Sequence, residues 1–92
     1  MRALTICAAF CCEELSDAQK TALIHRTLGR DLTTISLLMN LERQTVKNYL
    51  SDARRRLQAR TNEEACWLAR FMGQINDADI LAEYTREQER ER

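Results

Sequence analysis

The stretch QTVKNYLSDARRRL, residues 44–57, decides the fold because it sorts two kinds of side chain onto two sides of one helix. At about 100° per residue, four apolar side chains align as one stripe: Val46, Leu50, Ala53 and Leu57. The opposite side is polar and basic, with Arg43, Gln44, Lys47, Asn48, Ser51, Arg54 and Arg55. Such a helix buries one side and offers the other to an anion. The alternative is an ordinary amphipathic helix with a solvated basic face.

The composition predicts one small all-α domain. Of the 92 residues, 45% are apolar, and only two Gly and no Pro interrupt helices. Val46 is the single valine and aromatic residues are few, so the β-branched and aromatic runs that mark strands are missing. We therefore expect helices and no strand.

The zero net charge hides a polarised chain. Residues 1–60 contain ten Lys or Arg and six Asp or Glu, a balance of +4, whereas residues 61–92 contain four against eight, a balance of −4. Residues 43–60 alone carry six basic side chains and a single acid, Asp52. Such a patch attracts polyanions whatever the overall charge.

Four cysteines and an apolar start bear on the compartment. Cys7, Cys11 and Cys12 are crowded into one apolar segment far from Cys66, which is a poor disulfide framework. The segment has one early Arg, a short apolar run and acids directly after it, so it resembles a signal peptide only faintly. We expect it to be retained and the protein to be cytoplasmic with reduced thiols. No run approaches the roughly 18 apolar residues of a membrane span.

The cysteines and His25 also allow a metal or iron-sulfur hypothesis, because Cys7 and Cys11 are one helical turn apart. No Cys-x-x-Cys pair is present and the remaining ligands are undefined, so buried free thiols are the simpler interpretation. We expect no metal or other cofactor, and we expect His25 at the surface or half-buried. A Gly-rich phosphate loop and a nucleophile with a placed base are missing, so we expect neither enzymatic activity nor a small-molecule ligand.

The chain divides into an apolar, possibly helical extension, residues 1–14, a helical domain, residues 15–75, and a C-terminal helix with a charged tail, residues 76–92. Ser16 and Gln19 form a capping-box pattern at the start of the domain. The end of the tail alternates Arg and Glu with no apolar residue, so we expect it to be frayed or disordered. Alternatively, the acidic tail folds back over the basic helix and competes with the anion that this helix would bind.

A tight turn precedes the basic helix. Asp31 can cap a helix over Leu32 to Met39, and Asn40 can end that helix in the left-handed conformation. The basic helix, residues 43–58, begins three residues later. A short helix, a tight turn and a helix with a polar outer face form a helix-turn-helix unit, whose second helix normally enters a DNA groove.

A further helix follows, for which Thr61 or Asn62 can serve as the cap. Trp67 and Phe71 lie one turn apart, on a side separate from its apolar stripe. The aromatic pair is either covered by the N-terminal segment or forms a subunit or partner contact, because aromatic anchors are typical of interface hot spots. The predicted dimer or partner contact consists of Trp67, Phe71, Cys66 and Arg70.

A series of positions between about Leu15 and Ala69 matches a known family without a gap. They are Leu15-Ser16, Leu23, Gly29, Ile35, Thr45-Val46-Lys47-Asn48, Leu50, Leu57 and Ala65. In these residues the chain resembles the LuxR/GerE-type helix-turn-helix domain of bacterial transcription regulators. The resemblance implies a four-helix domain whose third helix contacts DNA and whose fourth often forms the dimer contact. The family usually places this domain behind a receiver or ligand-binding domain, and we expect this chain to act without either.

The resemblance implies base contacts from Lys47, Asn48 and Ser51. It implies that Thr45, Arg54 and Arg55 lie nearer the phosphates. The residue types suit these roles, since Lys and Arg hold phosphates while Asn, Gln and Ser can bond base edges. Glu42 stands where the family has a Ser cap, and it places a negative charge at the edge of this surface. The predicted DNA-binding residues are Arg43, Gln44, Thr45, Lys47, Asn48, Ser51, Arg54 and Arg55.

Two functions follow as hypotheses. The first is a DNA-binding transcription regulator that inserts the helix over residues 43–58 into the major groove of double-stranded DNA, as a homodimer. The second is a small antagonist that pairs with, or masks, a full-length regulator protein through Trp67, Phe71 and the N-terminal apolar segment. The basic residues favour the first, because an antagonist has no need of them.

Overall fold

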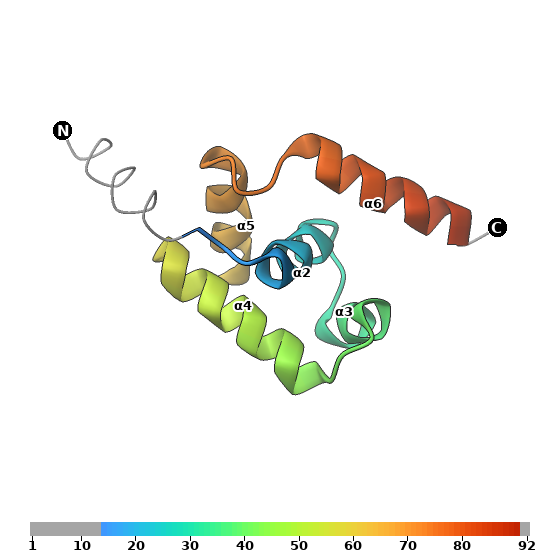
Figure 1. The fold of residues 1–92 in the computed structure, drawn as a ribbon, viewed down its shortest axis with the longest axis horizontal. Coiled ribbons are helices and arrows are strands. Elements are labelled where there is room, and N and C mark those ends of the chain that lie inside the picture. The colour runs from blue at the N-terminus through green and yellow to red at the C-terminus, as the bar shows by residue number, and fades with distance from the viewer. Residues whose placement is uncertain (1–13, 91–92) are drawn as a thin grey trace.

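The described part of the chain is entirely helical. The computed structural model describes residues 14–90, and within that range it contains five helices and no strand (Figure 1). In chain order the helices are α2 (Asp17–Thr27), α3 (Leu32–Met39), α4 (Arg43–Leu57), α5 (Asn62–Phe71) and α6 (Asp77–Arg90). The all-α prediction is thereby confirmed for these residues. The predicted N-terminal extension lies outside the described residues, apart from Glu14.

Three helices begin at the side-chain caps that the sequence predicts. The Ser16 hydroxyl accepts the Gln19 backbone N–H at 3.2 Å, and the Gln19 side chain accepts the Ser16 N–H at 3.0 Å, which completes a capping box at α2. Asp31 caps α3 and Thr61 caps α5, each accepting the backbone N–H three residues on, at 2.8 and 3.0 Å. Each cap stabilises its helix by about 1 kcal/mol.

A three-residue turn joins α3 to α4. Asn40 ends α3 in the predicted left-handed conformation, with φ 56° and ψ 47°. Asparagine tolerates this conformation because its short polar side chain can bond locally. Glu42 stands at the N-cap of α4 but makes no cap hydrogen bond through its side chain. The start of α4 is therefore held by packing rather than by a cap.

The apolar stripe of α4 packs into the core. All four predicted stripe residues are buried: Val46, Leu50, Ala53 and Leu57. They belong to one cluster with Leu23 of α2 and Ile35 of α3, which are fully buried. Burying one such side chain contributes roughly 1.5–3 kcal/mol. The packing fixes the rotation of α4 about its axis and turns its polar side outward.

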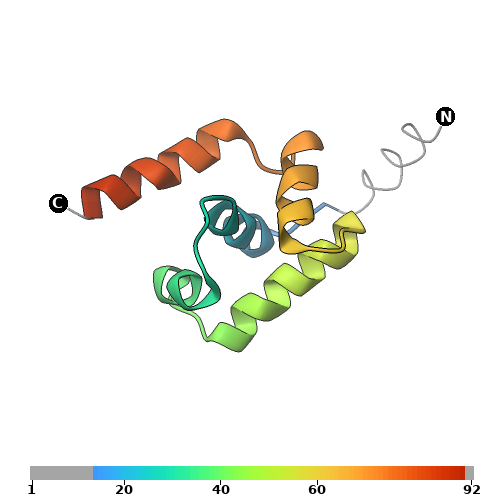
Figure 2. The ribbon, with the colours of Figure 1, turned by 180° about the vertical axis from the view of Figure 1, so that it is seen from behind.

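Helix α2 is the centre of the arrangement, because α3, α4, α5 and α6 all contact it. In Figure 1, and in the view from behind in Figure 2, α6 runs along one side of α2 and α4 along the other. The described part of the C-terminal segment therefore does not fold back over the basic helix.

The charged tail and His25 differ from the prediction. Helix α6 continues to Arg90, through the stretch expected to be frayed. The carboxylates of this helix meet Arg30, a buried arginine in the turn between α2 and α3 that is 7% exposed. Arg30 donates to Glu87 from Nε at 2.8 Å and to Glu83 from Nη1 at 3.1 Å. His25 contacts the same guanidinium and is 4% exposed, so it is buried rather than at the surface.

Candidate nucleic-acid interface

The outer side of α4 presents the predicted polar surface. Arg43, Gln44, Lys47, Asn48 and Ser51 are all exposed, over the first three turns of the helix. They share this side because the buried stripe occupies the other one. Cationic, amide and hydroxyl groups thus lie together on one convex surface. No acidic side chain interrupts these five residues along the helix.

Two of these side chains hold each other in place. The Gln44 amide Nε2 donates to Asn48 Oδ1 at 3.0 Å, across one helical turn. The bond occupies one N–H of Gln44 and the Asn48 oxygen, and leaves the Asn48 amide N–H groups and the Gln44 oxygen for an external partner. A fixed amide pair of this kind suits recognition of a flat donor and acceptor pattern such as a base edge.

The other three predicted DNA-binding residues differ in their exposure and in their bonds within the chain. Thr45 is half-buried beside the start of α4. Arg54 is also half-buried, and its guanidinium donates to the Asn62 side chain of α5. Arg55 is exposed and forms an ion pair with Asp52 at 3.1 Å. The second half of the helix therefore offers one held arginine and one partly neutralised arginine, so its positive field is weaker than the residue count predicts.

A shallow hollow adjoins the first turns of α4. It has a volume of about 330 Å³, and Leu32 at the start of α3 lines it together with three α4 side chains. Those three are Arg43, Gln44 and Lys47. Asp31 borders this region, and hydrogen bonds from Thr34, together with the Arg43 charge, lower the pKa of its carboxyl. An acceptor group entering the hollow would meet two cations, with Asp31 and Glu42 as the opposing acids.

The predicted dimer or partner contact is only partly at the surface. Trp67 and Phe71 are 59% and 68% exposed, and their rings stack with centroids 5.2 Å apart. Arg70 is exposed beside them and pairs with Asp77 at 2.9 Å. The assignment of Cys66 was wrong, because this side chain faces inward: its thiol donates to the Leu23 carbonyl at 3.5 Å, and burial raises its pKa.

The ionic cluster between α2 and α6, in which His25, Arg30 and Glu83 are buried, was missed. It consists of His25 and Arg30, with Glu83, Glu87, Arg86 and Arg90 from α6. A signal was present, because Ile80, Glu83, Glu87 and Arg90 recur at three- and four-residue steps and share one face of a helix. The alternating Arg and Glu residues of this segment made the helical spacing difficult to recognise.

Within residues 14–90, no group of three His, Cys, Asp or Glu side chains is placed to hold a metal ion. The cluster of Cys7, Cys11 and Cys12 lies outside the described residues. None of the helices described is long and apolar enough to cross a membrane. A scan against protein-family models and searches of curated proteins and of solved structures gave no match.

Proposed function

We propose that the chain is a DNA-binding transcription regulator of the LuxR/GerE helix-turn-helix type, in which α4 enters the major groove and two copies form a dimer. Helices α2 to α5 would correspond to the four helices of that family, with α3 and α4 as the helix-turn-helix unit. One observation carries the proposal: the side of α4 opposite its buried stripe exposes Arg43, Gln44, Lys47, Asn48 and Ser51 together.

The chemistry of this surface divides into two roles. Arg43 offers charge without directional selectivity, which suits phosphate oxygens, and the Lys47 ammonium can contact phosphate oxygens as well as base-edge acceptors. Asn48, held by Gln44, offers paired N–H donors, and Ser51 offers a hydroxyl one turn further along. Amide and hydroxyl groups of this kind discriminate bases in the major groove, where each base pair presents its own pattern. Arg54 and Arg55 would flank the groove, with Arg54 placed by its bond to Asn62.

Dimerisation supplies a second reading helix. The exposed Trp67 and Phe71 stack is the subunit contact that we propose, since large aromatic surfaces are typical of interface centres. In such a dimer the two α4 helices would enter successive major grooves, roughly 34 Å apart.

Variants on α4 test the proposal by separating the affinity for duplex DNA from the preference for a base sequence. Wild type and variants would be used to select bound duplexes from a randomised library. Lys47→Ala should weaken binding to all duplexes, while Asn48→Ala should relax the preference at one base pair, a loss of roughly 1–3 kcal/mol of discrimination. Lys20→Ala is the matched control, because Lys20 belongs to α2 and pairs with Glu14, and so is not part of the exposed side of α4. An unchanged preference with Asn48→Ala would show that the reading face is wrongly assigned.

The exposed aromatic pair also supports a second candidate, an antagonist that masks a full-length regulator protein. A stacked Trp67 and Phe71 surface can bind another protein as readily as a second copy. Pull-downs from host extract would compare wild type with a Trp67→Ala/Phe71→Ala double variant. Recovery of a regulator by the wild type alone would favour the antagonist hypothesis. Equal recovery of every protein by both would show that the aromatic pair is not the surface through which an antagonist binds.

A further inference from the structure

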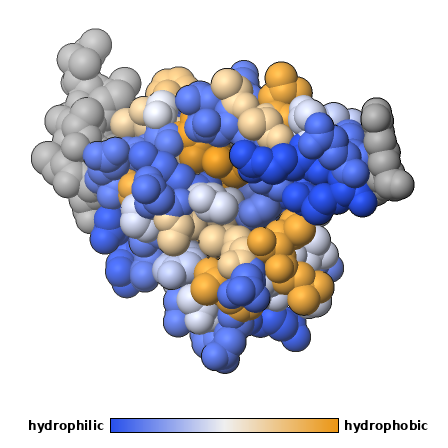
Figure 3. Space-filling view, turned by 45° about the vertical axis from the view of Figure 1, so that its right-hand side comes forward, coloured by the Kyte–Doolittle hydropathy of each residue, from blue (hydrophilic) through white to orange (hydrophobic). Residues whose placement is uncertain are grey.

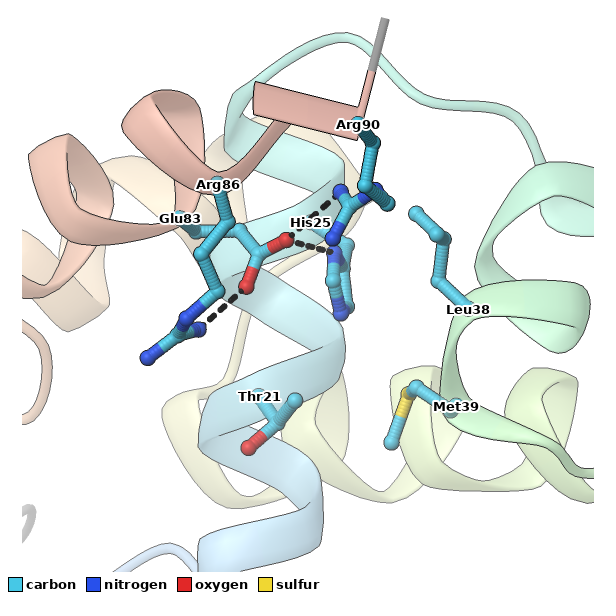
Figure 4. Close-up of a pocket in the computed structure, with 7 residues that line it drawn as sticks. All are labelled: Thr21, His25, Leu38, Met39, Glu83, Arg86 and Arg90. Atoms are coloured by element: carbon cyan, nitrogen blue, oxygen red, sulfur yellow. Dashed lines mark hydrogen bonds and ion pairs between the residues drawn. The ribbon is translucent and has the colours of Figure 1, made fainter. Parts of the chain in front are cut away.

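A groove lies between α6 and the helix pair α2 and α3, on the side of α2 away from α4. It has a volume of about 380 Å³, in the range of roughly 300–1,000 Å³ that is typical of small-molecule sites. The space-filling view shows apolar surface next to a strongly hydrophilic strip on this side of the molecule (Figure 3). The close-up shows side chains of all three helices directed into the space (Figure 4).

His25 presents a hydrogen-bond donor to this groove. Its Nδ1 contacts Arg30 Nη1, and a guanidinium has only donors, so Nδ1 must be the acceptor. We therefore assign the neutral tautomer with its proton on Nε2. Burial, partly opposed by the Glu83 charge, lowers the pKa of His25 and keeps the ring neutral near pH 7. In Figure 4 the second ring nitrogen points away from Glu83, toward the space between Thr21 and Met39.

Among the described residues His25 Nε2 has no protein hydrogen-bond partner, and although the side chain is only 4% exposed, this atom is not one of the fully buried ones, so it meets the solvent of the groove. Each of the other hydrogen bonds around the groove joins groups of the chain to one another. An N–H directed into a groove and left without a protein acceptor calls for an acceptor atom from a ligand or solvent.

The polar wall of the groove carries more positive than negative charge. Arg86 donates to Glu83 Oε1 at 2.7 Å and Arg90 donates to Glu83 Oε2 at 3.1 Å. With Arg30, three guanidinium groups thus share one carboxylate, and Arg86 and Arg90 each retain further N–H donors. Asp79 is a further acid nearby, and it lines the adjoining hollow on the other side of Arg86. The side chains that line the groove include two arginines but one carboxylate, so the lining carries a net positive charge.

The opposite wall is apolar. Leu38 and Met39, at the end of α3, face the arginines across the groove. Both are only partly buried by the rest of the chain. A ligand body placed against them would remove apolar surface from water, which is favourable by roughly 25 cal/mol per Å².

We propose that this groove binds a small organic anion, a carboxylate with a short apolar chain. The carboxylate would accept the His25 Nε2–H, with Arg86 and Arg90 supplying positive charge from the wall of the groove, while the chain lies against Leu38 and Met39. Because the anion bridges α2 and α6, its binding would hold α6 more firmly on the domain. The proposal is independent of whether α4 binds DNA, since the groove lies on the other side of α2.

The test uses hexanoate as the probe, with acetate and 1-hexanol as its polar and apolar halves. Backbone and Met methyl resonances of the full chain would be followed by NMR during titration at pH 7. We expect saturable shifts confined to the groove residues with hexanoate, and at least tenfold weaker binding of acetate and of 1-hexanol. Similar affinities for all three, or shifts without saturation, would overturn the proposal.

Two variants and one control locate the site. Arg86→Gln/Arg90→Gln should weaken hexanoate binding about tenfold, since the two positive charges on the wall of the groove are lost. Leu38→Ala serves as a second test, because it leaves the ionic cluster intact. It should weaken the binding of hexanoate and leave the binding of acetate unchanged. Arg55→Gln is the matched control, because Arg55 is also exposed and paired with an acid three residues away. Equal hexanoate affinity in both groove variants and the control would place the binding elsewhere.

Discussion

Replacing Arg30 by Met should destabilise the protein through α6. The Arg30 guanidinium lies between α2 and α6, donates to Glu87 from Nε and Nη2 and to Glu83 from Nη1, and is almost completely buried. Methionine keeps most of the volume of the side chain but removes the charge and all the donors. The carboxylates then lose the partner that draws α6 onto the domain.

The size of the effect follows from what remains. Removing one partner of a fully buried ion pair costs roughly 3–5 kcal/mol. Glu83 keeps Arg86 and Arg90, and the Glu87 side chain is 33% exposed, so water can replace part of its lost interaction. We therefore expect a loss of about 2–3 kcal/mol for Arg30→Met.

Urea unfolding followed by circular dichroism would measure this loss, and hydrogen exchange would locate it. The control is Arg26→Met, because Arg26 pairs with Glu63 at 2.6 Å but the two side chains are 29% and 71% exposed. That pair is screened by water, so its loss should cost less than about 1 kcal/mol. Arg30→Met should also reduce amide protection in α6 more than in α4. Equal losses for the two variants would refute the reasoning that burial makes Arg30 decisive.

Three other predictions concern the described core and turn. Below about pH 6.5 the free energy of unfolding should decrease, because burial lowers the pKa of His25 in the folded protein, so the unfolded chain binds a proton at this residue first. Urea titrations at pH 8 and 5.5 would measure the decrease. The substitution His25→Gln should remove this part of the pH dependence. Asn40→Ala should cost about 1 kcal/mol in thermal or urea unfolding because φ is positive there, whereas Asn40→Gly should be nearly neutral or stabilising. Cys66 should resist alkylation in the folded protein and react only after unfolding, as peptide mapping by mass spectrometry would show; fast labelling of folded protein would contradict its burial.

The helix-turn-helix region was predictable because its signals are local. Asp31 and Asn40 bound α3 through a side-chain cap and a left-handed end, and both depend on residues within a few positions. The stripe of α4 repeats at helical spacing, so its buried side and its polar side follow from the sequence alone.

The α2–α6 contact was not predictable in the same way. Arg30 and Glu87 are 57 residues apart, and the helical spacing of Ile80, Glu83 and Glu87 does not reveal which cation these carboxylates meet. The alternating charges of α6 are typical of a solvated tail, and only the buried guanidinium shows that one face of this helix is docked. Cys66 was misplaced because it precedes Trp67 in sequence, although adjacent helical residues point about 100° apart.

The proposed role of α4 in DNA binding is tested most directly by the salt dependence of affinity for duplex DNA. Arg43, Lys47, Arg54 and Arg55 lie on or beside the exposed face, and each phosphate neutralised contributes about 0.9 to the slope of log affinity against log salt. Four such contacts predict a slope near −3.6, or a loss of about 150-fold between 50 and 200 mM salt, for each protomer of the proposed dimer that binds. Fluorescence anisotropy with the duplex selected from the library would measure it. An absence of binding by folded protein at low salt, or an affinity that salt leaves unchanged, would contradict the account.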